Sequence, residues 1–310
     1  MVHPELTASP LPAPARRRLL RWGDRWRRDL PWRRTRDPWA VLVSELMLQQ
    51  TQVSRVIPRY EAFLSRFPTA GACAAAEVGE VVRAWAGLGY NRRAVSVHRA
   101  ATIVEHEHGG EVPDRLEALL GLPGVGPYTA RAVMAFAFER DVGVVDTNVA
   151  RVLARLAGRP LDRAEVQHLA DRAVPRGAGW RWNQAMLDLG ATVCTSRRPR
   201  CDACPVRAAC SWQARGGLPP DPARGSAGVS VPQSRFEGSD RQGRGRLVRA
   251  LREQGVVEPS DVAAVAGWPG DHQRAARVVA SLVRDGLAVV DSAGRVRLPS
   301  VQPVTGGPTR

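Results

Sequence analysis

The sequence predicts a mainly α-helical protein that ends in a small domain containing a β-hairpin. Apolar residues recur at helical spacing through most of the chain before its cysteine-rich segment. The clearest pattern runs from Leu116 to Leu156, where two amphipathic helices flank the turn Leu122–Gly126. Residues 287–299 instead alternate apolar and polar side chains around Ser-Ala-Gly, which is typical of two paired strands.

Composition favours a nucleic-acid partner. The chain of 310 residues has a net charge of +15, and all 45 of its cationic Lys and Arg residues are Arg. Such a basic protein is expected to bind a polyanion, and nucleic acid is favoured over an anionic membrane. The sequence shows neither a membrane-spanning run nor the apolar core of a signal peptide. We therefore expect a cytoplasmic, nucleoid-associated bacterial protein.

The turn at Gly124 and Gly126 is a candidate phosphate site. Glycines allow backbone amides to face a ligand, and a helix beginning near Pro127 adds its own unpaired amides. A nucleic-acid backbone would supply the phosphate. The alternative is an ordinary tight turn between packed helices.

Residues 1–14 are rich in Pro and Ala, and we expect them to form a disordered tail. Residues 15–36 combine many Arg with Leu19, Trp22 and Trp26 at helical spacing, which indicates a docked helix with a basic outer face. Asp37-Pro38 then marks the start of a helix, with an N-cap side chain followed by proline.

Glu45 is unusual because it shares a helix face with Val41 and Leu48. Loss of water would raise the pKa of a carboxyl group there and make it a proton donor near neutral pH. Alternatively, Glu45 points outward or pairs with an Arg. The amides of Gln49 and Gln50 could pair with base edges, and the loop Gly87–Tyr90 displays an aromatic ring that could enter a base stack. Both patterns also occur in ordinary helix ends.

Asp146 precedes the apolar helix Val149–Leu156, so its simplest role is an N-cap. A carboxylate at a helix N-terminus is also held ionised. An ionised Asp beside a desolvated Glu is the arrangement that acid-catalysed glycosidic cleavage requires.

Four cysteines occur at the spacing Cys-x6-Cys-x2-Cys-x5-Cys, namely Cys194, Cys201, Cys204 and Cys210. Four thiolates so close in sequence can bind zinc or a [4Fe–4S] cluster. Zinc ribbons prefer two Cys-x2-Cys pairs and this chain has one, so the cluster is favoured. Cys73 stands apart in an Ala-rich segment and is expected to be a buried apolar residue.

A linker is predicted at 213–242 from its Pro, Gly, Ser and Arg content, followed by a domain at 243–299 and a tail at 300–310. The pattern of that domain predicts three helices and a hairpin. The first helix contains Leu247, Leu251 and Val256, the second spans Ser260–Ala266 and the third spans Asp271–Arg284. This order is typical of a winged helix, which binds either duplex DNA or protein.

Six motifs in order resemble the A/G-specific adenine DNA glycosylases of the MutY type, in the helix-hairpin-helix superfamily with endonuclease III. They are SELMLQQTQV, GLGY, LPGVGPYTA, VVDTNVARVL, NQAMLDLG and the four-cysteine loop at 194–210. The resemblance covers about residues 15–215. It implies a two-lobed glycosylase domain at 15–212 with a [4Fe–4S] cluster, acting as a monomer on double-stranded DNA with a mispaired adenine and on no membrane.

The resemblance also assigns roles to individual residues. Glu45 would protonate adenine at N7, Asp146 would stabilise or trap the sugar cation, and Tyr128 and Asn148 would support them. The base pocket and DNA contacts would involve Arg33, Leu48, Gln49, Gln50, Thr51, Tyr90, Gly124 and Gly126. Within this set, Leu48 and Gln50 would line the pocket of the flipped adenine, and Tyr90 and Gln49 would probe the opposite strand.

Tyr128 stands where strand-cutting relatives carry a Schiff-base lysine, so the resemblance implies a monofunctional enzyme that leaves an abasic site. The winged helix replaces the nudix-like domain that usually reads 8-oxoguanine, although FEGSDRQ at 236–242 could take part. Two alternatives stay open: a thymine or uracil mismatch glycosylase of the same superfamily, and a non-enzymatic iron–sulfur DNA-binding regulator.

Overall fold

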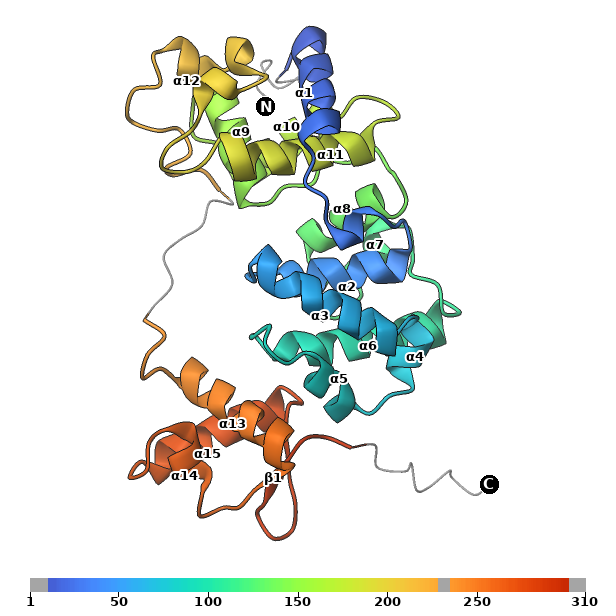
Figure 1. The fold of residues 1–310 in the computed structure, drawn as a ribbon, viewed down its shortest axis with the longest axis vertical. Helices are drawn as coiled ribbons and strands as arrows, with labels where there is room; N and C mark the ends of the chain where they lie inside the picture. Colours follow the sequence, from blue (N-terminus) through green and yellow to red (C-terminus); the bar gives the residue numbers. More distant parts are fainter. Residues whose placement is uncertain (1–10, 228–234, 301–310) are drawn as a thin grey trace. The chain divides into compact units, whose positions relative to one another are not determined.

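The computed structural model describes residues 11–227 and 235–300, and these residues are mainly helical (Figure 1). The chain forms two compact units, each assembled from separate segments. Unit 1 comprises Met1–Val41, Asp114–Glu117 and Gly126–Pro232. Unit 2 comprises Leu42–Pro113, Ala118–Val125 and Gln233–Arg310. The mainly α-helical fold predicted from the sequence is confirmed, whereas the predicted domain limits stay predictions.

Unit 1 is built around a helical core. Its complete helices are α1 (Ala13–Trp26), α8 (Pro127–Phe136), α9 (Thr147–Ala157), α10 (Arg163–Ala173), α11 (Gly179–Asp188) and α12 (Ser211–Ala214). Short helical turns η2 (Pro31–Arg33), η3 (Leu189–Val193), η4 (Cys201–Ala203) and η5 (Arg207–Ala209) connect them. Helices α2 (Pro38–Leu48) and α7 (Leu116–Leu120) contain residues of both units.

Helix α1 packs tightly against α11. A Cβ atom added to Gly23 would lie 2.6 Å from the Cβ of Ala185, so the two backbones approach as closely as glycine allows. Leu19 is buried as predicted, whereas Trp26 is 61% exposed and contacts Arg25. Leu11 is also buried, and α1 begins at Ala13. Ordered structure therefore starts within the stretch expected to be a disordered tail, of which residues 1–10 lie outside the described residues.

Unit 2 begins with the remaining residues of α2. Its next helices are α3 (Val53–Arg66), α4 (Ala70–Ala74), α5 (Val78–Ala84) and α6 (Arg92–Glu107). Helix α4 has only five residues and lies in an Ala-rich segment. Cys73 lies in α4 with no exposed surface, as expected.

The C-terminal part of unit 2 has winged-helix topology. Its elements are α13 (Asp240–Gln254), β1 (Val256–Val257), α14 (Val262–Ala266), α15 (His272–Arg284), β2 (Val289–Val290) and β3 (Val296–Arg297). The antiparallel sheet has the order β1-β3-β2. Val256 belongs to β1 rather than to the first helix, because Gly255 ends α13 at a φ of 81°. Helix α13 also begins inside the stretch predicted as a linker.

Polar contacts, among them the following three hydrogen bonds, join this winged-helix domain to α5 and the start of α6. Arg252 of α13 donates from Nε to the carbonyl of Val82 (3.0 Å) and from Nη2 to Oδ1 of Asn91 (2.6 Å). The amide of Gly79 donates to the carbonyl of Pro299 (2.9 Å). Burial lowers the pKa of Arg252 to about 10, so its guanidinium carries charge at neutral pH. The domain is therefore anchored at two places.

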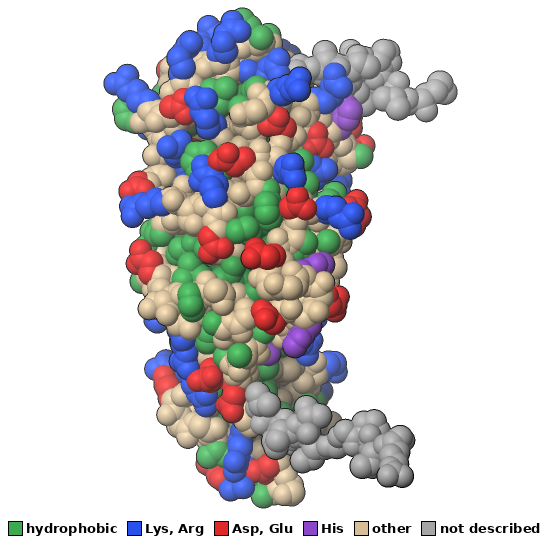
Figure 2. Space-filling view, turned by 90° about the vertical axis from the view of Figure 1, so that its right-hand side faces the viewer, with side chains coloured by type: hydrophobic (Ala, Val, Ile, Leu, Met, Phe, Trp, Pro, Cys, Tyr) green, Lys and Arg blue, Asp and Glu red, His purple; other side chains and the backbone are tan. Residues whose placement is uncertain are grey.

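The surface carries charge of both signs. Figure 2 shows arginine side chains distributed over the drawn face, with acidic side chains between them. None of the helices in the described part of the chain combines the length and hydropathy of a membrane-spanning segment.

Candidate active site and cysteine cavity

Asp146 occupies the N-cap of α9. Its Oδ1 accepts a hydrogen bond from the backbone amide of Val149 (2.7 Å), and its Oδ2 accepts one from Nδ2 of Asn148 (2.8 Å). The carboxylate is therefore held by both oxygens at the positive end of the helix. The structure brings Asp146 and Asn148 together.

Burial nevertheless raises the pKa of Asp146 above its ordinary value. The hydrogen bonds from Val149 and Asn148 and the positive charge of Arg151 act in the opposite direction, without cancelling the loss of water. The sequence-based expectation of a firmly ionised carboxylate is therefore too simple, because it included the helix end and omitted desolvation.

Arg151 lies one turn further along α9 and supports Asn148. Its Nη2 donates to Oδ1 of Asn148 (2.8 Å) and to the carbonyl of Gly190 (2.7 Å), and its Nε donates to the carbonyl of Cys194 (2.8 Å). Sequence reasoning missed this residue, because an Arg within an amphipathic helix normally indicates an exposed face. Its three-residue spacing from Asn148 was the available signal.

The turn before α8 leaves backbone groups accessible. Gly126 is the N-cap of α8, and a Cβ atom built on it would meet nothing within 4 Å. The side chain of Tyr128, in the first turn of α8, is half-buried. Gly124 adopts a φ of 82°, a left-handed conformation that favours glycine. This geometry is compatible with phosphate binding at the turn, which stays a prediction.

Glu45 is buried in the part of α2 that belongs to unit 2, with 3% of its surface exposed. Its neighbours Leu42 and Leu46 have no exposed surface. The structure thus places this carboxyl group inside an apolar helix environment, as the position of Val41 and Leu48 on the same face predicted. Its role as an acid stays a prediction.

Arg93 of α6 organises the residues that follow Glu45. Its Nη1 donates to the carbonyls of Leu46 and Met47 (both 2.8 Å), and its Nη2 donates to Oγ1 of Thr51 (2.9 Å). Two carbonyl groups in the last turn of α2 thus accept hydrogen bonds from a side chain that is 8% exposed. Burial lowers the pKa of Arg93 to about 10.

The same guanidinium also reaches the loop that displays Tyr90. Nη2 of Arg93 donates to the carbonyls of Leu88 (3.2 Å) and Gly89 (3.1 Å), and Tyr90 is 45% exposed at a φ of 45°. Arg93 therefore ties the end of α2 to this loop. Sequence reasoning missed Arg93, because its partners are backbone carbonyls distant in the sequence.

Two further contacts gather predicted site residues in unit 2. Thr51 Oγ1 donates to the carbonyl of Leu88 (3.2 Å), and Nε2 of Gln49 donates to the carbonyl of Gly124 (3.2 Å). Leu48 is half-buried at the end of α2. Gln50 is exposed in a left-handed conformation at a φ of 54°. These residues form a candidate base-binding surface between α2, the Tyr90 loop and the hairpin turn.

Arg33 differs from the other candidates because it is part of the interior of unit 1. Its Nη1 and Nη2 atoms bind the two oxygens of Asp188 (2.7 and 2.9 Å), and Nε of Arg28 adds a third bond (2.6 Å). Burial alone would raise the pKa of Asp188, but Arg33 and Arg28 hold it below its ordinary value. This arrangement indicates a structural role, and a DNA contact by Arg33 stays a prediction.

The four clustered cysteines line a single cavity in unit 1. Cys194, Cys201, Cys204 and Cys210 are all free thiols, and Arg155, Arg207 and Trp212 complete much of the wall. Burial raises the pKa of Cys204 to about 11, so a nearby cation would be needed to stabilise its thiolate.

The donor set consists of four thiols that line one cavity. Within residues 11–227 and 235–300, no three His, Cys, Asp or Glu side chains are arranged to hold one metal ion. In a four-iron cluster each thiolate binds its own iron, so the ligands stand farther apart than around one zinc ion. Four thiols around one cavity therefore fit such a cluster.

Comparison with known proteins identifies the family. Residues 43–176 match the model of the HhH-GPD superfamily of base excision DNA repair proteins. The chain is 43% identical over 286 residues to an adenine DNA glycosylase of Mycolicibacterium smegmatis, covering 90% of this chain and 94% of the relative. The chain belongs to the adenine DNA glycosylase family. The helix-hairpin-helix resemblance inferred from the motifs is thus confirmed.

Solved structures support the fold of this adenine DNA glycosylase family member. A thermostable thymine-DNA glycosylase is 31% identical, with a TM-score of 0.60 over 64% of this chain and 95% of that one. An endonuclease III trapped in a covalent intermediate with DNA is 22% identical, with a TM-score of 0.58 over 66% of this chain and 96% of that one. The likeness to endonuclease III concerns the fold alone.

Candidate site residues of this glycosylase family member come from both units. Unit 1 supplies Gly126, Tyr128, Asp146, Asn148 and the cysteines, and unit 2 supplies Glu45, Leu48–Thr51, Tyr90 and Gly124. Hydrogen bonds join Asp146 to Asn148 in unit 1 and Gln49 to Gly124 in unit 2. The cooperation of Glu45 with Asp146 stays a prediction.

Proposed function

We propose that this protein is a monofunctional DNA glycosylase that removes adenine mispaired with 8-oxoguanine or guanine. Membership of the adenine DNA glycosylase family carries this proposal. The expected acid, Glu45, is buried, and the expected anion, Asp146, is fixed at a helix N-terminus. The reaction leaves an abasic site, because the chain has no lysine to form a Schiff base with the sugar.

The chemistry divides between the two carboxyl groups. Glu45 donates a proton to N7 of the adenine, which turns the base into a better leaving group. As the bond to the sugar breaks, positive charge develops on the sugar, and ionised Asp146 stabilises it. Asn148 keeps the Asp146 carboxylate in one orientation, and Arg151 keeps Asn148 in place.

Double-stranded DNA is the proposed partner. The target adenine must leave the base stack, because its glycosidic bond is inaccessible inside the duplex. Leu48 and Gln50 then line its pocket, while Gln49 and Tyr90 contact the opposite strand. The open amides at Gly124 and Gly126 bind the DNA backbone.

We also propose that Cys194, Cys201, Cys204 and Cys210 hold a [4Fe–4S] cluster. Such a cluster supplies cross-links between segments of the loop and a redox-active centre. Iron analysis and visible absorbance of protein purified without oxygen test this assignment. Stoichiometric zinc without iron would refute it.

One assay tests the proposed activity and its specificity. Duplexes containing 8-oxoG:A, G:A, G:T or G:U are incubated with the protein, and each product is analysed with and without alkali. We expect strand breaks from the two A-containing duplexes only after alkali. Glu45→Gln should reduce excision by at least about a hundredfold, and Asp146→Asn by about a hundred- to a thousandfold.

Glu61→Gln is a matched control, because Glu61 is an exposed carboxylate on α3. It should excise adenine at the wild-type rate, and all variants should bind the duplex comparably. Near-normal excision by Glu45→Gln would show that the acid has been assigned to the wrong residue.

Removal of thymine from a G:T pair is the second candidate function. Its support is the 31% identity to a solved thymine-DNA glycosylase. The 43% identity to an adenine glycosylase over most of the chain favours adenine, and so does the expected protonation of a purine nitrogen by Glu45. Cleavage of the G:T duplex alone would establish this alternative.

A further inference from the structure

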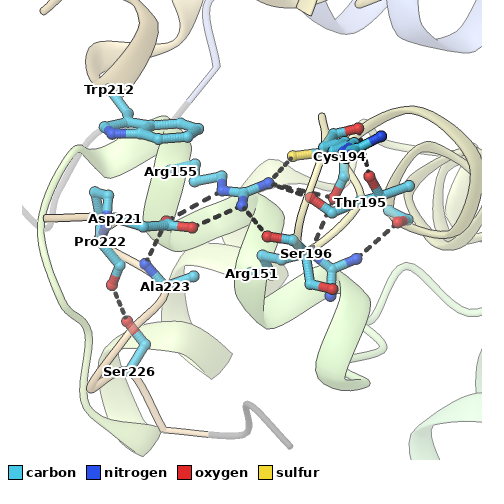
Figure 3. Close-up of polar contacts among 12 residues, drawn as sticks. Arg151, Arg155, Cys194, Thr195, Ser196, Trp212, Asp221, Pro222, Ala223 and Ser226 are labelled. Atoms are coloured by element: carbon cyan, nitrogen blue, oxygen red, sulfur yellow. Dashed lines mark hydrogen bonds and ion pairs between the residues drawn. The ribbon is translucent and has the colours of Figure 1, made fainter. Parts of the chain in front are cut away.

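Arg155 lies in the last turn of α9 and contacts the cysteines that line the cavity (Figure 3). Its Nη1 atom donates to Sγ of Cys194 (3.3 Å) and to the carbonyl of Thr195 (2.8 Å). Its own carbonyl accepts a hydrogen bond from Sγ of Cys210 (3.3 Å). Arg155 thus contacts both the first and the last cysteine of the loop, and only 2% of its surface is exposed.

A segment that follows the cysteines supplies the counter-charge for Arg155. Asp221 binds it with both oxygens, at 3.1 Å from Nε and 2.7 Å from Nη2 (Figure 3). Asp221 Oδ1 also accepts from the amide of Ala223 (3.0 Å), which fixes the orientation of the carboxylate. A planar guanidinium bound in this way has one preferred orientation.

The segment around Asp221, residues 218–227, is attached to unit 1 at each end. Nε1 of Trp212 donates to the carbonyl of Leu218 (2.9 Å), and the Trp212 ring centroid lies 4.7 Å from the guanidinium carbon of Arg155. At the other end, Ser226 Oγ accepts from the amide of Leu161 (3.1 Å), whose carbonyl accepts from the amide of Ala227 (2.9 Å). We call residues 218–227 the strap.

We infer that Arg155 is a positioning residue for a metal cluster on the four cysteines, and that Asp221 of the strap holds Arg155 in place. The inference rests on the proposed [4Fe–4S] cluster. The carboxylate that secures the cluster therefore lies outside the cysteine motif. Partners of metal ligands orient the ligands and tune the metal, and their loss typically weakens metal binding about 10- to 100-fold.

A hydrogen bond to a ligand sulfur also affects the electronic state of a cluster. A reduced cluster carries one more negative charge than an oxidised cluster, so a nearby cation and an N–H···S bond stabilise the reduced state. Arg155 supplies both at Cys194. Loss of Arg155 should therefore lower the reduction potential of the cluster, which a purely structural role would not require.

The first test compares two Asp→Asn variants in the full chain. Asp221→Asn removes the carboxylate that holds Arg155, whereas Asp202→Asn removes a 95% exposed carboxylate that pairs with Arg207 inside the cysteine loop. Iron loss to a chelator is followed by visible absorbance. We expect Asp221→Asn to lose iron about tenfold faster than wild type, and Asp202→Asn to match wild type.

Equal rates of iron loss from Asp221→Asn and wild type would overturn the role of the strap. If Asp221→Asn does not fold, as judged by far-ultraviolet circular dichroism, Arg155→Lys replaces it. Lysine keeps the charge but cannot bind Asp221 with two nitrogens and also reach Cys194, so the same acceleration is expected.

The second test measures the midpoint potential. Arg155→Met should lower it more than Arg207→Met does, because Arg207 is a cation on the same cavity wall but makes no hydrogen bond to sulfur among the contacts of the described residues. Equal shifts would overturn the role assigned to the N–H···S bond. Wild-type protein without iron would instead refute the proposed cluster, and this inference with it.

Discussion

Asp146 caps α9 with the same carboxylate that we expect to face the sugar. Both of its oxygens accept hydrogen bonds, so the orientation of the side chain is fixed before DNA binds. Desolvation raises the pKa of this group, and the folded protein therefore holds the ionised form at a cost in stability.

This cost predicts a pH-dependent stability difference for Asp146→Asn. A carboxyl group with a raised pKa contributes its full stability below the unfolded pKa, about 3.8, and loses it as pH rises through the folded pKa. Asn does not titrate. The melting temperature of the variant relative to wild type should therefore increase between pH 4 and pH 7.5. A constant offset across this range would contradict the raised pKa.

For Asp188 we predict the opposite pH dependence of stability, because Arg33 and Arg28 lower the pKa of this carboxyl group. Asp188→Asn leaves the buried guanidinium of Arg33 without its counter-charge, and should destabilise the protein by about 3–5 kcal/mol in urea unfolding at neutral pH. The contribution of Asp188 should be present above pH 3.8 and lost as pH falls through its lowered pKa.

Asp29→Asn provides the control for this measurement. Asp29 also pairs with an Arg of the same region, Arg34, but both side chains are more than half exposed. Exposed ion pairs contribute little to stability, so the urea midpoint of Asp29→Asn should stay close to wild type. Similar destabilisation by the two variants would show that the buried ion pair of Asp188 contributes no more to stability than the exposed pair of Asp29.

At the scale of elements, we predict that a substitution in the helix-hairpin-helix turn changes DNA binding without changing folding. Gly126→Ala should fold normally, because the added Cβ has space and the φ of −98° suits any residue. If the amides there bind phosphate, the methyl group obstructs one contact and weakens binding by about 1 kcal/mol, or about fivefold. Fluorescence anisotropy with a labelled duplex measures the change. Unchanged affinity would exclude Gly126 from the interface.

The winged-helix domain should depend on Arg252 for its attachment. Arg252→Ala removes both hydrogen bonds to the α5 region and leaves the carbonyl of Val82 without this donor. We expect faster hydrogen exchange in α5 and α13 than in wild type. Arg249→Ala, one turn earlier on α13, removes only an exposed pair with Glu253 and should leave exchange unchanged. Equal protection in both variants would mean that Arg252 does not anchor the domain.

Helix starts could be predicted from the sequence, whereas hydrogen-bond networks between distant residues could not. Helix starts such as Asp37-Pro38 and Asp146 were found because N-caps are local: Asp37 accepts from the amide of Trp39, and Asp146 from that of Val149. Arg93 and Arg151 were missed because they satisfy carbonyls supplied by tertiary packing. The burial of Arg33 was not predicted for the same reason, since its partner Asp188 lies far away in the sequence.

At the scale of the whole molecule, the absence of lysine restricts the chemistry of the protein. Without a side-chain amine, reduction by borohydride during the reaction should trap no more than a slow adduct at the N-terminal amine. Gel electrophoresis of wild-type protein on the 8-oxoG:A duplex, beside a bifunctional lyase, measures this. Trapping at the level of the lyase would contradict a monofunctional reaction.

The position of the strap in the sequence also sets the order in which the parts of the cysteine site are completed during translation. Arg155 leaves the ribosome first, the four cysteines follow, and Asp221 emerges after all of them. Each growing chain therefore passes through a stage at which the thiols are complete but Arg155 lacks its bidentate partner. Iron delivered at that stage would meet a cavity whose arginine wall is not yet fixed, and translation through residue 227 would then complete the attachment of the strap.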